Sequence, residues 1–272
     1  MINLVLRKLK SFFMKFFKYF YRSKSISIMI NSIPKSGTHF ADQIVSPIKQ
    51  VNDFGYFIAQ QPTFPHILRN ENKILKMMDK IKCGEIVRSH IHFSKLVHQK
   101  ILEKKILMIF IYRDPRDIAI SESFYLYKMN KFHSAHKYFK KVHDPKERIV
   151  LSIKGINDNK IDFKKIGDRI NPYINWKNKN LKNVLPISYE EMTNDIDSVI
   201  KTIYNFLIKN NFFRSEISEV EFLKLVKKNI NPNKSHTFRE GKINKWIELF
   251  DEDITKIFYE NDGGSTSKLG YK

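Results

Sequence analysis

The sequence is short of cysteine and of the residue patterns that bind metals or nucleic acids. Cys83 is the only cysteine among 272 residues, so the chain cannot form an internal disulfide. This favours a reducing compartment, and we expect the protein in the cytoplasm. No spacing of cysteine, histidine or acidic residues predicts a metal site. No arginine-rich arm, zinc-finger spacing or RNA-binding signature predicts nucleic acid as a partner.

Acidic residues are scarce relative to basic ones. The chain has 49 Lys and Arg against 28 Asp and Glu, which gives a formal net charge of +21. Such an excess attracts polyanions, acidic membrane surfaces and phosphorylated ligands, although lysine spread over solvated faces explains it equally well. A hydrophobic content of 42% excludes a disordered chain and a polytopic membrane protein. The length suits a single α/β domain with insertions.

The N-terminal segment, residues 1–24, lacks a long uninterrupted apolar run. Basic residues recur throughout Leu4–Arg22, and each would cost about 2.5–3.5 kcal/mol near the centre of a bilayer. A transmembrane helix and a signal peptide are therefore both disfavoured. On a helical wheel the apolar and basic residues separate, which predicts a basic amphipathic helix. Two placements stay open: residues 1–22 on an anionic surface at the inner face of the membrane, or packed on the domain or a partner chain.

The rest of the chain, residues 25–272, alternates short strand patterns with helical patterns. The four strand patterns span residues 25–31, 85–89, 106–112 and 184–188. Helical patterns follow, for example over 117–128 and 196–210, whereas 211–240 is the least regular part. This alternation predicts an α/β fold, a single domain with a mostly parallel central sheet flanked by helices.

Polar or charged residues follow the four predicted strands, where ligands bind in such sheets. They are Lys35, His90, Arg113 and Tyr189. After the first strand, PKSGT leads into a helix and directs backbone N–H groups at one anion. Side chains that add a charge or hydrogen-bond donors there are Lys35, Ser36, Thr38 and His39. The order Lys-Ser-Gly differs from the G-x-x-x-x-G-K of kinases and ATPases, which disfavours that class.

A second anion site is predicted after the third strand. The stretch YRDPRDIAIS places Ser121 eight residues after Arg113. Pro115 suits the first turn of a helix, and Ser121 then lies about two turns into it. Arg113, through its fork, and Ser121, through its hydroxyl, can therefore grip one phosphate.

Together these stretches resemble the sulfotransferases that use 3′-phosphoadenosine 5′-phosphosulfate (PAPS), closest to the cytosolic type. In that family the PKSGT loop holds the 5′-phosphosulfate, and an Arg and a Ser eight residues apart hold the 3′-phosphate. The stretches ISYEEM at 187–192 and FREGKINKW at 238–246 resemble two further family segments. The resemblance implies a P-loop-like nucleotide-binding fold, PAPS as donor, adenosine 3′,5′-bisphosphate (PAP) as product, and no metal. The residues that the resemblance implies for nucleotide binding are Lys35, Ser36, Gly37, Thr38, His39, Phe40, Arg113, Ser121, Tyr189, Phe238, Arg239 and Gly241.

The resemblance also implies the catalytic residues. His90 stands where the family has a His that deprotonates the acceptor, and His92 is its rival. Lys35 would neutralise charge on the oxygen that bridges sulfate and nucleotide. Arg88, where the family has Lys, would stabilise the equatorial oxygens of the transferring sulfuryl group. The implied reaction is an in-line sulfuryl transfer.

The acceptor is left open as a hydroxyl or amine of a glycan, a lipid-linked molecule, or a small alcohol or phenol. Residues 52–66 and 129–148 mix aromatic and polar side chains, and we expect them to line the acceptor side. Two alternatives to a sulfotransferase are a P-loop nucleoside kinase or NTPase, and a non-catalytic nucleotide-binding module docked on a membrane.

Overall fold

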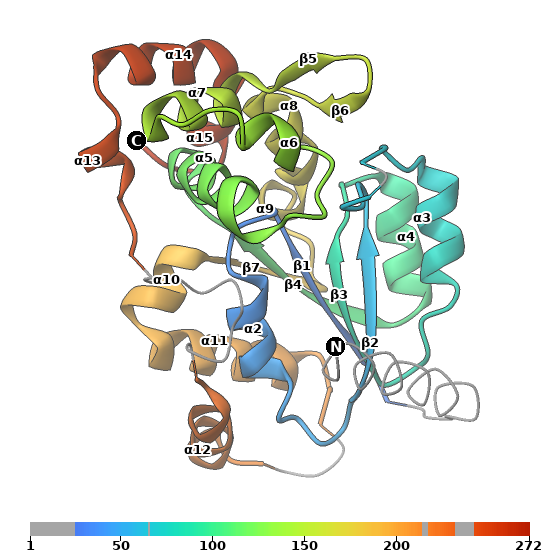
Figure 1. Cartoon of the computed structure of the whole chain (residues 1–272). Coiled ribbons are helices and arrows are strands. Elements are labelled where there is room, and N and C mark those ends of the chain that lie inside the picture. Colours follow the sequence, from blue (N-terminus) through green and yellow to red (C-terminus); the bar gives the residue numbers. More distant parts are fainter. Residues whose placement is uncertain (1–24, 65, 214–216, 232–241) are drawn as a thin grey trace, which may run out of the picture.

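The computed structural model describes residues 25–64, 66–213, 217–231 and 242–272, so the predicted N-terminal helix lies outside the described part. The domain is built on a five-stranded parallel sheet in the order β2-β3-β1-β4-β7 (Figure 1). The strands are β1 (Ser27–Ser32), β2 (Asn52–Ala59), β3 (Glu85–His90), β4 (Ile106–Tyr112) and β7 (Val184–Ser188). The predicted α/β fold and parallel sheet are confirmed.

Both faces of the sheet carry hydrophobic cores, because successive side chains of a strand point to opposite faces. In β1, Met29 packs into one core and Ile28 and Ile30 pack into the other. The helices of the first core are α3 (Glu71–Met78), α4 (Lys95–Glu103), α5 (Pro115–Phe124), α7 (Pro145–Lys154), α8 (Ile166–Ile170), α9 (Asn175–Asn178) and α14 (Glu252–Asp262). Those of the second are α2 (Thr38–Val45), α10 (Tyr189–Asn194), α11 (Ile196–Lys209) and α12 (Glu219–Asn229).

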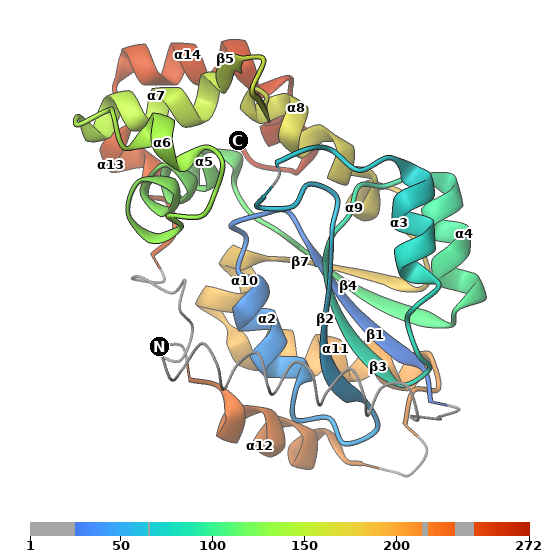
Figure 2. The same ribbon diagram turned by 45° about the vertical axis from the view of Figure 1, so that its right-hand side comes forward.

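Several short elements lie together with α5, α7, α8 and α14 at one end of the sheet (Figure 2). They include a π-helix η1 (Tyr125–Met129), α6 (His136–Phe139), and an antiparallel hairpin of β5 (Ile156–Asp158) and β6 (Ile161–Phe163). The remaining ones are the 3₁₀ helix η2 (Asn171–Tyr173), α13 (Trp246–Leu249) and α15 (Ser265–Lys268).

Two parts of the chain differ from the sequence-based expectation. The prediction that 211–240 is irregular is wrong for α12, whose capping box between Ser218 and Glu221 starts an 11-residue helix. The helix predicted over 117–128 ends as α5 at Phe124 and continues as the π-helix. Among the described helices, none combines the length and the apolar character that crossing a membrane requires.

Candidate active site

The loop between β1 and α2 is shaped to hold an anion. The backbones of Lys35 and Gly37 are both left-handed, with φ of 72° and 92°. A Cβ added to Gly37 would lie 2.6 Å from Cδ2 of Tyr189, so only glycine fits there without a shift. Gly37 is also the N-cap of α2 and offers no side chain to cap it. No described side chain therefore covers the positive end of the α2 dipole, which favours an anion beside this loop.

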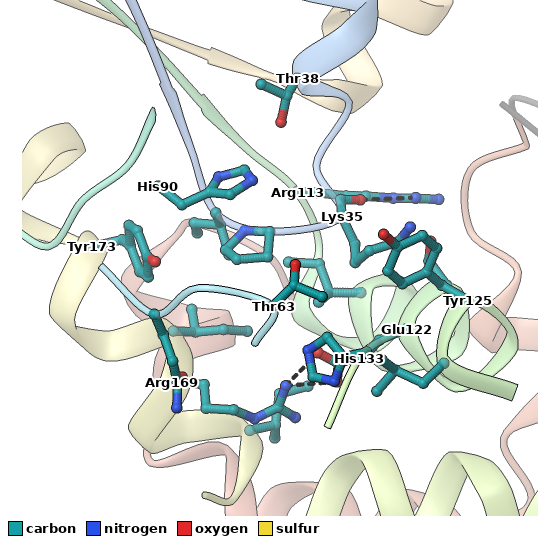
Figure 3. A pocket seen from close by; sticks show the side chains of 18 of the residues that line it. Lys35, Thr38, Thr63, His90, Arg113, Glu122, Tyr125, His133, Arg169 and Tyr173 are labelled. Carbon is teal, nitrogen blue, oxygen red and sulfur yellow. Dashed lines mark hydrogen bonds and ion pairs between the residues drawn. The ribbon is translucent and has the colours of Figure 1, made fainter. Parts of the chain in front are cut away.

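Most of the predicted site residues meet in one cavity of about 400 Å³. Those that line it are Lys35, Gly37, Thr38, His39, Phe40, His90, Arg113, Ser121 and Tyr189. Ser36 is fully buried beside it. Figure 3 shows Lys35, His90 and Arg113 around this cavity.

Two polar atoms at the nucleotide end are buried without a partner. Ser36 Oγ and Arg113 Nε have no hydrogen bond to any described residue. Buried donors are almost always satisfied in folded proteins, so each unsatisfied one marks a place for a ligand. The oxygens of a phosphate or sulfate would supply the missing acceptors, and these residues therefore fit the two anionic ends of PAPS.

Arg113 is held from three sides. Its guanidinium lies 4.3 Å from the centroid of the Tyr189 ring. Nη2 donates to the carboxylate of Asp117 at 3.2 Å and to the carbonyl of Lys242 at 3.0 Å. Ser121, on α5, lines the same cavity as Arg113, as the predicted Arg–Ser pair requires.

The described end of the FREGKINKW segment is tied to this site through Asp117. The fully buried carboxylate of Asp117 accepts backbone N–H groups from Asn244 at 2.9 Å and Trp246 at 3.2 Å. Phe238, Arg239 and Gly241, which were predicted to bind the nucleotide, lie outside the described residues.

His90 is positioned by β1. Its Nδ1 lies 2.8 Å from the carbonyl oxygen of Ser32 and 3.1 Å from the Ser32 hydroxyl. A carbonyl only accepts, so the network assigns the proton to Nδ1 and leaves the lone pair on Nε2. Burial, together with the charges of His39 and Lys35, lowers the pKa of His90 to about 4, while the hydrogen bond to Ser32 opposes this shift. The ring is thus neutral at pH 7, as a general base must be.

We expect the nucleotide-free protein to show this lowered pKa directly. Histidine-selective labelling and an NMR titration should give a midpoint for His90 near pH 4. In the unfolded chain a histidine titrates near pH 6.5. The contribution of neutral His90 to folding stability is therefore fully present above pH 6.5, and it is lost as the pH falls towards 4. A midpoint at or above 6.5 would contradict the burial of this ring.

Arg88 has partners other than the one predicted. Its Nη1 and Nη2 donate to both oxygens of Asp53 at 2.9 and 2.6 Å, and Nη2 lies 2.7 Å from Asp42. Among the described residues, those that line the cavity do not include Arg88. Arg88 therefore joins β2 and α2 to β3, and this geometry does not support its predicted contact with the transferring group.

Arg88→Met should consequently lower stability more than nucleotide binding. It leaves Asp42 and Asp53 without their shared cation, at a cost of about 2 kcal/mol of unfolding free energy, less than for a fully buried pair because Asp53 is partly exposed. Urea unfolding and PAP titration measure the two effects. If the variant were as stable as the parent but bound PAP much more weakly, the result would support the predicted role of Arg88 in the site.

The acceptor end of the cavity has polar side chains that the sequence did not reveal. The loop after β2 contributes Thr63 and His66, and the segment after η1 contributes His133. Glu122 accepts from Arg169 Nη1 at 2.6 Å in the same wall, as Figure 3 shows. These residues come from the segments expected at the acceptor side, except Glu122 and Arg169, which are 47 positions apart in sequence.

His92 also lines the cavity, against Tyr173, with the ring centroids 4.8 Å apart. Burial lowers its pKa to about 4, as for His90. Both histidines are therefore neutral at pH 7, and what distinguishes them is position. His90 is bonded to β1, the strand that precedes the PKSGT loop.

Comparisons with known proteins identify the family to which the chain is similar. A family model of the sulfotransferase domain matches residues 25–261. Sulfotransferase 6B1 of Mus musculus is 25% identical over 248 residues, which cover 85% of this chain and 73% of that protein. The 3-beta-hydroxysteroid sulfotransferase of Cavia porcellus is 24% identical over 261 residues, covering 87% and 83%.

Solved structures share the fold. Mouse sulfotransferase SULT7A1, complexed with PAP, superposes with a TM-score of 0.58 at 21% identity and covers 88% of this chain and 84% of that one. Retinol dehydratase, in complex with androsterone and inactive cofactor PAP, has a TM-score of 0.54 at 15% identity, covering 90% and 82%.

The chain belongs to the sulfotransferase family, because the family model spans nearly all of it. It is an enzyme of that class, and the resemblance read from the PKSGT loop and the Arg113–Ser121 spacing is confirmed. The kinase or NTPase interpretation is not favoured. Among the described residues, no group of His, Cys, Asp and Glu could hold a metal ion.

Proposed function

We propose that this sulfotransferase takes the sulfuryl group from PAPS and transfers it to a hydroxyl, or an amine, with His90 as the general base. The observation that carries the proposal is that three features lie in or directly beside one cavity. They are the Nε2 lone pair of His90, the charge of Lys35, and the buried donors of Ser36 and Arg113 that no described residue satisfies. Two proteins of the same fold were crystallised with PAP, which is what remains of PAPS after transfer.

The chain's residues divide the binding of the donor between two sites. The PKSGT loop would hold the 5′-phosphosulfate, and Arg113 with Ser121 would hold the 3′-phosphate. Lys35 Nζ lies 3.7 Å from the centroid of the Tyr125 ring, which keeps its ammonium in the cavity. From there it would offset the negative charge that develops on the bridging oxygen.

His90 would act on the other reactant. PAPS supplies the activated sulfur–oxygen bond. As the acceptor oxygen bonds to sulfur, the bridging S–O bond breaks, its electrons leave with PAP, and the acceptor proton passes to His90 Nε2. The Ser32 carbonyl, which accepts from Nδ1, fixes the ring and favours its protonated form.

Nucleotide binding and acceptor screening test this function. We expect PAP to bind equally well with Mg²⁺ and with EDTA, and ³⁵S-labelled PAPS to pass its label to at least one hydroxyl acceptor. Binding of ATP that depends on Mg²⁺, with no binding of PAP, would contradict the proposal.

The placement of the protein in the cell stays a prediction. The amphipathic segment of residues 1–22 lies outside the described residues, so we keep its contact with an anionic membrane as a proposal, together with the cytoplasmic location.

A further inference from the structure

Two surface loops meet where the acceptor end of the cavity opens. Residues 61–64 and 66–68 form one, and residues 129–134 form the other; we call them the entrance loops. The backbone N–H of Ser134 donates to the carbonyl of Thr63, and the rings of His66 and His133 lie 4.4 Å apart. Thr63 and Leu68 line the cavity and are also exposed to solvent, so the opening lies between these loops. In Figure 3, Thr63 and His133 lie on the same side of the cavity.

Both entrance loops hold large apolar side chains in solvent. Phe132 is 87% exposed and Phe64 is 77% exposed. Three further exposed side chains lie on the same loops: Ile67, Leu68 and Met129. Single exposed apolar residues are ordinary, but a group of five around a cavity entrance marks a surface that meets an apolar partner.

The stretches of chain that hold the entrance loops are basic, although Asp158 of β5 accepts a hydrogen bond from Tyr138 of α6. No Asp or Glu occurs from Ser123 to His143, or from Phe54 to Asn70. The first of these stretches contains five lysines, all exposed: Lys128, Lys131, Lys137, Lys140 and Lys141. The last three flank or lie in α6, which is bonded back to η1 where His136 Nδ1 lies 2.7 Å from the carbonyl of Leu126. Five exposed lysines therefore lie in the same stretch of chain as Met129 and Phe132.

This combination selects an anionic lipid bilayer. A polyanion such as nucleic acid would use the lysines but would leave Phe64 and Phe132 in water. An apolar protein surface would use the phenylalanines but has no need of the positive field. Aromatic side chains that enter the interface, ringed by lysines that contact anionic headgroups, are the means by which proteins lie on membranes.

The interior fits the same partner. The same cavity is lined by polar side chains, among them His66, His133 and the Glu122–Arg169 pair. An amphiphile could therefore leave its chains in the bilayer and place a polar headgroup in the cavity. A polar cavity behind apolar loops fits a molecule with a polar headgroup and apolar chains.

We propose that the entrance loops dock on an anionic membrane, and that the acceptor is a membrane-borne amphiphile whose headgroup carries the hydroxyl that is sulfated. This rests on the proposed function, and it names the acceptor class. It does not depend on residues 1–22, because the loops form their own contact.

A depth-sensitive probe in the full chain tests the docking. Phe132→Trp places an indole on the rim, and vesicles of phosphatidylcholine with phosphatidylglycerol and brominated acyl chains quench only an indole that reaches the hydrocarbon. The unmodified chain, with Trp176 buried and Trp246 half-buried, gives the background. We expect quenching with the anionic vesicles and much less with pure phosphatidylcholine. Binding of the vesicles without quenching of the introduced indole would overturn the proposal, because another segment would then make the contact.

Matched substitutions give a second test. The double variant Phe64→Ser, Phe132→Ser should weaken vesicle binding at least tenfold. Transfer of one phenylalanine side chain from water into hydrocarbon strengthens binding about tenfold or more. Val220→Ser with Leu96→Ser, exposed apolar residues on α12 and α4, should leave binding unchanged. Figure 1 shows α12 at the opposite end of the molecule from α6. Equal binding by both double variants would also overturn the docking.

Two further measurements separate this inference from the proposed function. PAP affinity and turnover of a water-soluble alcohol should be the same in the entrance variant and the parent. With vesicles that contain a hydroxyl-bearing glycolipid and labelled PAPS, the entrance variant should lose most of the labelled lipid. If the parent chain binds no PAP, the proposed function fails whatever the vesicles show; if PAP binds but labelled lipid is equal in both forms, the docking fails alone.

Discussion

His90→Ala is expected to lower turnover by about 10²–10⁴-fold, the usual contribution of a positioned general base. The substitution removes Nε2, the imidazole nitrogen that carries no proton because Nδ1 donates to the Ser32 carbonyl. PAP affinity should stay within about threefold, because the predicted phosphate contacts are made by the PKSGT loop and by Arg113 with Ser121. Initial rates with labelled PAPS and calorimetric titration of PAP measure the two quantities.

His92→Ala is the matched control, because His92 lines the same cavity and has the same lowered pKa. We expect it to change acceptor KM more than kcat. Added imidazole should restore part of the turnover of His90→Ala and none in His92→Ala. Full activity in His90→Ala, with loss in His92→Ala, would transfer the role of base to His92.

Arg113→Met is expected to weaken PAP binding by about 100-fold. A guanidinium that grips a phosphate makes charge-assisted hydrogen bonds, each worth about 1.5–3 kcal/mol, and methionine keeps the apolar stem while removing all of them. Ser121→Ala removes one neutral donor and should cost only about five- to tenfold. Calorimetric titration of PAP into each variant gives the dissociation constants.

The same titration with adenosine 5′-phosphate separates the two phosphate sites. This nucleotide lacks the 3′-phosphate, so Arg113→Met should bind it nearly as well as the parent does. Asp117 keeps the N–H groups of Asn244 and Trp246 when Arg113 is replaced, so thermal unfolding should show a folded variant. An equal loss of affinity for both nucleotides would mean that Arg113 supports the loop rather than the 3′-phosphate.

The sequence was enough to predict those parts of the fold whose signals are local. β1, β4 and β7 are mainly apolar and are each followed within a few residues by a polar side chain of the site, and β3 ends on His90. The anion-binding loop could also be predicted from PKSGT, whereas the close approach of Tyr189 to Gly37 is visible only in the folded chain. The capping box of α12 was a local signal too, and it was overlooked because turn residues surround it.

The rest depends on contacts between distant residues. β2 escaped prediction because Gly55 interrupts its pattern and its register shifts between Asp53 and Tyr56. The role expected of Arg88 came from its position in a motif, whereas its orientation is set by Asp42 and Asp53 on two other elements. No sequence pattern pairs Glu122 with Arg169, so the polar wall at the acceptor end was visible only in the folded chain.

The bond between Arg88 and Asp53 has a consequence for the behaviour of the protein in solution. Among the described strands, β2 is the last on its side of the sheet. The outer strand of a sheet is where the sheets of two molecules can pair, and an irregular or charged outer strand disfavours this pairing. The register shift bends the edge, and the charged pair keeps a carboxylate at its start, so Arg88 and Asp53 help to keep separate molecules from joining their sheets.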